Sequence, residues 1–78
     1  MPHVVVKLAP GRSEEQKTHL AGEITKDVVS IFNCGAELVS VAFEEVEPRD
    51  WTETVYKPDI QSKWETLYKK PGYNPFEK

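Results

Sequence analysis

The sequence changes from the periodicity of a strand to that of a helix and back again, and this pattern limits the fold more than any other feature. A short apolar run at 3–8 precedes an amphipathic segment at 14–33, and a second short apolar run follows at 38–43. Short β-branched runs are typical of strands, and apolar residues three or four positions apart are typical of a helix. A strand, a helix and a strand predict a β-α-β unit of the α/β (α+β) class, with parallel strands joined by a right-handed crossover.

Signals at both ends define the expected helix. Ser13 is followed three residues later by Gln16, the spacing of a capping box, and the first turn is acidic. We expect the helix to end near 33–35, where Gly35 can adopt the left-handed cap conformation. The helix has an apolar stripe made of Leu20, Ile24, Val28 and Ile31.

The remainder of the chain predicts a turn, a short extended segment and a second helix. The turn at 48–50 leads into Trp51, and 54–56 is a candidate strand. We expect the second helix to start near Pro58 or Asp59 and to stop at Pro71, with Trp64 in the core. Its apolar stripe would consist of Ile60, Trp64, Leu67 and Tyr68.

The sequence offers neither an internal disulfide nor a recognisable structural metal site to stabilise so short a chain. It has 78 residues, 38% of them hydrophobic, with Cys34 as the single cysteine and two histidines. A domain this small buries only about 60% of its unfolded surface. An internal disulfide is excluded and a structural zinc site is not expected, so self-association is the expected source of further burial. We expect one domain over 1–78, with a β-α-β core at 2–51 and a C-terminal helix and tail at 52–78.

The charge pattern narrows the class of partner. The net charge is −3, and the only basic doublet is Lys69-Lys70. Nucleic-acid binders usually carry a basic surplus or stripe, so no nucleic-acid partner is expected. No apolar run is long enough to span a membrane, and no secretory signal is recognised. We expect a cytoplasmic protein without a membrane partner.

Pro2 is a candidate base because of its position. If Met1 is removed, Pro2 becomes a terminal secondary amine, whereas a proline within the chain has no basic nitrogen. An α-amino group titrates near ~7.7–8.0, and apolar surroundings lower its pKa. Such a base can accelerate a proton transfer by ~10²–10⁴-fold. The alternative is that Pro2 merely follows the start residue.

Arg12 and Trp51 are candidate substrate contacts. Arg12 lies just before the expected helix, where a guanidinium can bind a carboxylate through two hydrogen bonds. Trp51 can line a pocket and lower its polarity. The alternatives are a solvated loop arginine and an ordinary core or interface tryptophan.

Together, these features resemble the 4-oxalocrotonate tautomerase family. The likeness rests on Pro2 after the initiator methionine, the motif Gly11-Arg12-Ser13, the long helix and the run Val39-Ser40-Val41. It covers roughly 2–51. The second part of the chain, with its Lys-Lys-Pro-Gly-Tyr motif at 69–73, resembles the longer, dimeric members found in enterobacteria.

The resemblance implies a β-α-β protomer that pairs with a second copy into a four-stranded sheet. It implies that Pro2 is the general base, that Arg12 holds a substrate carboxylate and that Trp51 lines the pocket. No metal or organic cofactor is implied. The family prototype has a second arginine where this chain has Ser40, so a small monocarboxylate such as an arylpyruvate enol is the expected substrate, with Ser40 a candidate contact.

Two other functions stay open on the sequence alone. One is a hydratase or dehalogenase on the same scaffold, in which a carboxylate such as Glu45 activates water. The other is a non-catalytic interaction protein that retains the fold.

Overall fold

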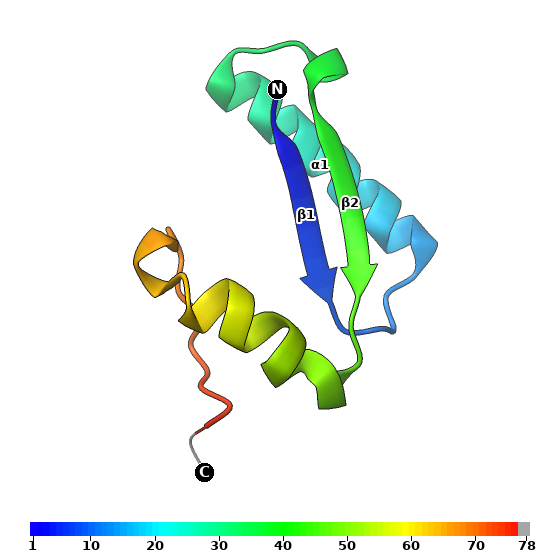
Figure 1. Ribbon diagram of the computed structural model, residues 1–78. Coiled ribbons are helices and arrows are strands. Elements are labelled where there is room, and N and C mark those ends of the chain that lie inside the picture. The colour runs from blue at the N-terminus through cyan, green and yellow to red at the C-terminus, as the bar shows by residue number, and fades with distance from the viewer. Residues whose placement is uncertain (77–78) are drawn as a thin grey trace. The chain divides into compact units, whose positions relative to one another are not determined.

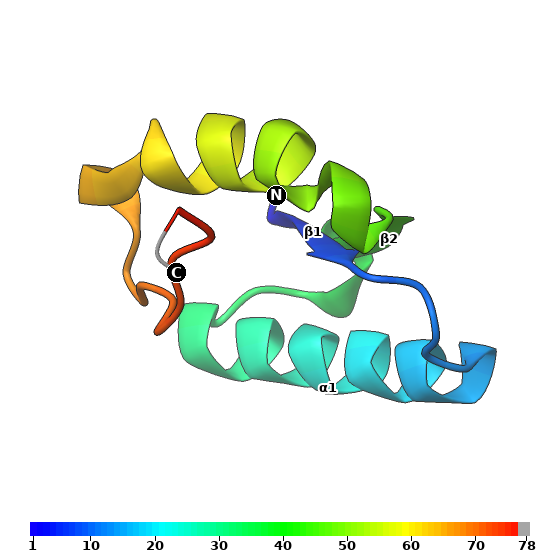
Figure 2. The same ribbon diagram turned by 90° about the horizontal axis from the view of Figure 1, so that it is seen from below.

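The first part of the protein forms the expected strand, helix and strand. The structure, a computed structural model, describes residues 1–76. Strand β1 (His3–Leu8) is followed by helix α1 (Glu14–Phe32) and strand β2 (Ser40–Glu45), and the two strands pair in parallel. Helix α1 lies along one face of this two-stranded sheet (Figures 1 and 2). The β-α-β prediction is therefore confirmed.

The pairing register assigns each side chain to a face of the sheet. His3 is opposite Ser40, and the register continues to Leu8 opposite Glu45. Successive side chains alternate between faces, so Val41 and Phe43 share a face, which lies against α1. Val5 belongs to the other face and is 42% exposed.

The start of α1 is as predicted, and the helix ends at Phe32, beside the predicted 33–35, but the residue that adopts the left-handed cap differs. Ser13 accepts a hydrogen bond from the Gln16 N–H (3.0 Å), and the Gln16 side chain accepts one from the Ser13 N–H (2.9 Å), which completes the capping box. The left-handed cap is Asn33 (φ 57°), whereas Gly35 is extended. The prediction of Gly35 was wrong because asparagine also tolerates the left-handed conformation.

Strand β2 begins and ends two residues later than the sequence predicts. Leu38 belongs to the short 3₁₀ turn η1 (Ala36–Leu38), and the strand continues through Glu44 and Glu45. The apolar pattern placed the end of the strand at Phe43. Backbone pairing with β1 continues to Leu8, however, so Glu44 and Glu45 also belong to the strand.

The segment from Val46 onward forms a second compact unit, separate from Met1–Glu45. It contains the 3₁₀ turn η2 (Pro48–Asp50), the π-helical segment η3 (Thr52–Gln61) and the 3₁₀ turn η4 (Trp64–Thr66). In η3 the hydrogen bonds span five residues, as in that from the Ser62 N–H to the Lys57 carbonyl (2.9 Å).

Three predictions for this second unit were wrong. The segment 54–56 is helical rather than extended, because Val55 and Tyr56 are buried on η3 (4% exposed each), which overrides their strand preference. Helical structure begins at Thr52 rather than near Pro58, which lies within η3. Trp64 is 37% exposed in η4 instead of lying in the core.

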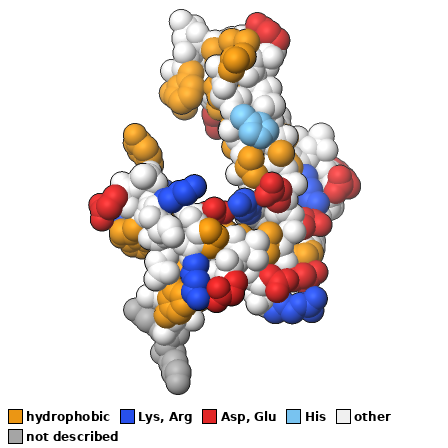
Figure 3. Space-filling view, in the orientation of Figure 1, with side chains coloured by type: hydrophobic (Ala, Val, Ile, Leu, Met, Phe, Trp, Pro, Cys, Tyr) orange, Lys and Arg blue, Asp and Glu red, His pale blue; other side chains and the backbone are white. Residues whose placement is uncertain are grey.

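The described residues bury little apolar surface. Val55 and Tyr56 are the only buried hydrophobic residues among 1–76, and none of the residues 1–45 is buried. Hydrophobic side chains are exposed where α1 ends and η1 begins (Figure 3), among them Ile31, Phe32 and Leu38. Within the described range, no helix has the length and apolarity needed to cross a membrane.

Candidate active site

Pro2 lies at the N-terminal end of β1 and is half-buried. Its carbonyl accepts a hydrogen bond from the Ser40 N–H at 3.2 Å, which fixes it to the start of β2. Met1, which precedes it, is fully exposed. The candidate base is therefore attached to a strand end whose position is set by cross-strand hydrogen bonding.

Ser40 lies beside Pro2 and makes a further contact that the sequence did not reveal. Its hydroxyl oxygen is 2.6 Å from Nδ1 of His3, its cross-strand partner. The structure therefore brings Pro2, His3 and Ser40 together at one end of the sheet. No local pattern in the sequence reveals this contact, because only the pairing register identifies Ser40 as the cross-strand partner of His3.

Within one protomer, Arg12 lies in the loop that follows the C-terminal end of β1, whereas Pro2 precedes the N-terminal end of that strand. Figure 1 shows this loop leading from the end of β1 into α1. Arg12 is exposed in this loop, directly after Gly11, whose φ of 125° is a conformation that favours glycine. A strand of this length rises about 20 Å. One protomer thus does not bring Arg12 and Pro2 together.

Trp51 belongs to the second unit, between η2 and η3, and is half-buried. Its indole N–H donates a hydrogen bond to the hydroxyl oxygen of Tyr73 at 2.8 Å. Tyr73 is part of the Lys-Lys-Pro-Gly-Tyr motif noted in the sequence, but no local pattern links it to a residue 22 positions earlier.

An aromatic cluster surrounds this hydrogen bond. The ring of Tyr56 lies 5.6 Å from that of Tyr73, with an interplanar angle of 53°. The Tyr56 ring is also 5.8 Å from that of Phe76 in an edge-to-face arrangement. Because Tyr56 is buried on η3, these contacts attach the tail to the helical segment.

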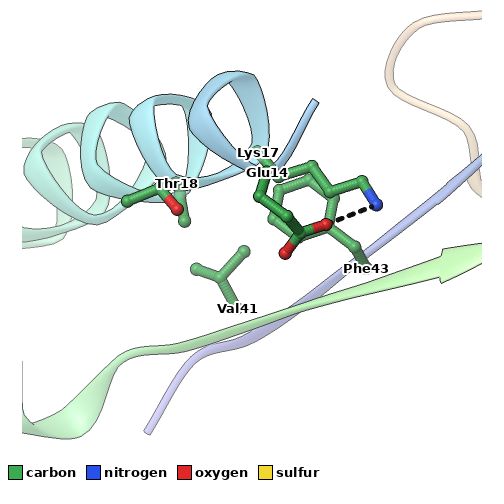
Figure 4. A pocket seen from close by; sticks show the side chains of 6 residues that line it. Glu14, Lys17, Thr18, Val41 and Phe43 are labelled. Atoms are coloured by element: carbon green, nitrogen blue, oxygen red, sulfur yellow. Dashed lines mark hydrogen bonds and ion pairs between the residues drawn. The ribbon is translucent and has the colours of Figure 1, made fainter. Parts of the chain in front are cut away.

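An open groove of about 380 Å³ lies between α1 and β2 (Figure 4). The Lys17 ammonium in it donates to Glu45 (2.6 Å) and Glu14 (3.2 Å). These hydrogen bonds, that to Glu45 foremost, raise the pKa of Lys17 above its usual value. The groove is lined by Glu14, Lys17, Thr18, Ala21, Val41 and Phe43.

The pairing with Lys17 bears on the water-activating alternative. Glu45 lies at the C-terminal end of β2, whereas Pro2 lies at the opposite end of the sheet. The Glu45 carboxylate is also already engaged by the Lys17 ammonium, at 2.6 Å. Within one protomer Glu45 is therefore poorly suited to activate water beside Pro2.

Residues 1–76 contain no group of three or more histidine, cysteine, aspartate or glutamate side chains arranged to hold a metal ion. Cys34 is a free thiol and half-buried.

Comparisons with known proteins agree on one family. A family described as "Tautomerase enzyme" matches residues 2–54. A "Probable tautomerase" of Xylella fastidiosa (strain 9a5c) is 42% identical over 73 residues, covering 94% of this chain and 89% of that relative. The "Tautomerase PptA" of Enterobacter sp. (strain 638) is 41% identical over 75 residues, covering 95% and 99%. The crystal structure of YwhB, a homologue of 4-oxalocrotonate tautomerase, has a TM-score of 0.57 at 35% identity and covers 59% of this chain and 75% of that one.

Proposed function

This chain belongs to the tautomerase family and is an enzyme of the isomerase class, and from that premise we propose that it interconverts the keto and enol forms of a small 2-oxo carboxylate, with the amine of Pro2 as general base. The observation that carries the proposal is the position of Pro2. It is half-buried at the start of β1 and hydrogen-bonded through its carbonyl to β2. Removal of Met1 would turn its nitrogen into a secondary amine.

The proposed reaction is one proton transfer in two steps. Neutral Pro2 takes the proton of the enol hydroxyl, and the bonding electrons stay on oxygen. As the carbonyl forms at C2, the electron pair of the C2–C3 double bond takes the proton back from Pro2 at C3. The intermediate is an enolate, so a site that holds the carboxylate and donates a hydrogen bond to the C2 oxygen stabilises it. The proposed route requires no cofactor.

We assign Arg12 to the substrate carboxylate and infer that it acts from a second protomer. Within one protomer Arg12 and Pro2 lie at opposite ends of β1. If two copies pair through the same strand about a twofold axis, the paired strands run antiparallel. The start of one strand then lies beside the end of the other. The lack of buried residues over 1–45 supports such pairing into a four-stranded sheet.

The remaining assignments concern the pocket and the substrate. Trp51 is proposed to line an apolar pocket. Ser40 is proposed to contact the substrate beside Pro2, because the Ser40 N–H donates a hydrogen bond to the Pro2 carbonyl. Ser40 stands where the family prototype has a second arginine, so the proposed site is better suited to a substrate with one carboxylate than to one with two. An arylpyruvate fits this description best. A single domain over 1–78 and a cytoplasmic location stay predictions.

Ketonisation of the phenylpyruvate enol, followed by ultraviolet absorbance, tests the proposal. Pro2→Ala should lower kcat/KM by about 10²–10⁴-fold, because it replaces the secondary amine that acts as base. A 3-haloacrylate assayed in parallel separates the alternatives, since halide release without phenylpyruvate turnover would indicate the dehalogenase. Turnover of neither compound would overturn the proposed substrate class.

A further inference from the structure

The hydrogen bond between the side chains of His3 and Ser40 has no role in the mechanism so far. We propose that His3 is a positioning residue for the reaction: its Nδ1–H donates to the hydroxyl oxygen of Ser40, so that the Ser40 proton is donated to the C2 oxygen of the 2-oxo acid. The inference rests on the proposed function, which places Ser40 in contact with the substrate beside Pro2. All three residues belong to the unit Met1–Glu45.

The pairing register locates both side chains at the end of the sheet that holds the candidate base. His3 and Ser40 are directly opposite each other on β1 and β2, and such partners project from the same face of a sheet. The Ser40 N–H also donates to the Pro2 carbonyl at 3.2 Å, which anchors Ser40 next to Pro2. A substrate held at the Pro2 nitrogen therefore lies at the end of the sheet that carries the Ser40 hydroxyl.

The pair lies on the face of the sheet opposite α1. Alternation along β2 separates Ser40 from Val41 and Phe43, which lie against α1. On the face that Ser40 shares, Val5 is 42% exposed, and the side chains of the pair are themselves exposed within the described residues. A substrate can therefore approach the Ser40 hydroxyl from this face.

The direction of the hydrogen bond determines what a substrate meets. A serine hydroxyl has one proton to donate and an oxygen that accepts, and a neutral imidazole has a proton on one of its two nitrogens. Nδ1 of His3 is 2.6 Å from the Ser40 oxygen, which has no other side-chain partner among residues 1–76. When Nδ1 carries the proton, the Ser40 proton is left for a ligand, whereas a bare Nδ1 takes that proton. Only the first arrangement stabilises an oxygen that becomes negative.

This donor suits the step that needs it. The C2 oxygen is neutral in the ketone and negative in the enolate, so a neutral hydroxyl binds the intermediate more strongly than the ground state. A donor that is held in place by a second hydrogen bond stabilises the developing charge without first reorganising. Accepting the His3 N–H also polarises the Ser40 hydroxyl and makes it a stronger donor. We therefore expect the pair to act on kcat more than on KM.

A double-mutant cycle on ketonisation of the phenylpyruvate enol tests the coupling. Ser40→Ala should lower kcat about 10- to 100-fold with a smaller change in KM, because a hydrogen bond to the enolate is lost. His3→Phe keeps an aromatic ring but removes both nitrogens, and it should lower kcat about 5- to 10-fold. In a Ser40→Ala background His3→Phe should have no further effect, whereas a purely structural role of His3 would lower kcat in both backgrounds.

A conservative variant and a matched control separate positioning from folding. His3→Asn can place an amide N–H where Nδ1 stands, and it should restore most of the activity lost in His3→Phe. His19→Gln removes the other histidine, which lies on α1 at 3.5 Å from Glu23, and should change neither kcat nor KM. Circular dichroism and thermal midpoints of all these variants should match those of the parent.

Nitrogen-15 NMR of the imidazole tests the direction of the hydrogen bond without any turnover. The spectra are recorded on His19→Gln, in which His3 is the only histidine. A proton on Nδ1 supports the proposal, whether or not the second ring nitrogen is also protonated. A bare Nδ1 overturns it, because the Ser40 proton is then committed to His3.

The outcomes distinguish this inference from the function on which it rests. Independent effects of His3→Phe and Ser40→Ala, or no recovery with His3→Asn, overturn the role of His3 and leave Pro2 as the proposed base. No turnover of the phenylpyruvate enol by the parent overturns the proposed substrate class and this inference together. Coupled losses with recovery in His3→Asn support the inference even if turnover proves independent of Pro2.

Discussion

At the scale of single residues, the site that we propose is assigned to residues from separate places in the chain. Pro2 and Ser40 are adjacent through the hydrogen bond between their backbones, and Trp51 and Tyr73 through that between their side chains. Pro2 could be identified as a candidate from the sequence, because its candidacy depends on its place directly after Met1 and not on the fold. The sequence did not reveal the Tyr73 contact, since a hydrogen bond between distant side chains leaves no local pattern.

Removing the guanidinium of Arg12 tests its proposed contact with the substrate. Arg12→Ala should raise KM for the phenylpyruvate enol about 10- to 100-fold with a smaller effect on kcat, because a charge-assisted hydrogen bond to the carboxylate is lost. Steady-state kinetics measure both values. Arg49→Ala, which removes the other exposed arginine, is the control and should change neither. Unaltered kinetics in Arg12→Ala would remove Arg12 from the site.

At the scale of elements, the boundaries that side chains encode were predictable, and those that depend on pairing or packing were not. The start of α1 follows from Ser13 and Gln16, which satisfy each other's backbone groups. The end of β2 depends on its register with β1, and η3 depends on burial of Val55 and Tyr56. Neither register nor burial can be read from a short window of sequence.

The capping box gives a prediction for α1. Ser13→Ala removes the side chain that accepts the Gln16 N–H and should lower the free energy of unfolding by about 1 kcal/mol. Urea denaturation measures the change. Ser30→Ala, on the exposed surface of the same helix, is the matched control and should have little effect. Equal stabilities of the two variants would show that the cap contributes nothing.

At the scale of the whole molecule, the described part of the protomer buries little apolar surface, and a single cysteine cannot compensate with an internal disulfide. Short length and a single cysteine predicted self-association, and the absence of buried residues over 1–45 gives the same indication from the structure. The opposite positions of Pro2 and Arg12 along β1 add a functional reason, because the site that we propose is complete only with a second copy.

Mixed dimers test whether the site is shared between protomers. Pro2→Ala and Arg12→Ala proteins, each nearly inactive at low substrate concentration, are unfolded, mixed and refolded together. If Arg12 acts across the interface, each mixed dimer regains one intact site, and about a quarter of the wild-type activity should return. No recovery, with mixed dimers verified by native mass spectrometry, would place both residues in one protomer.

The central claim is that the free amine of Pro2 is the base, and the most direct test varies only the residue before it. The chain is released from a cleavable leader so that it begins either at Met1 or at Pro2, and intact mass identifies each form. The measurement is kcat/KM for the phenylpyruvate enol. We predict at least about 10²-fold higher activity for the chain that begins at Pro2, because the nitrogen is an amide in the other form. Equal activity of the two forms would contradict the proposed mechanism.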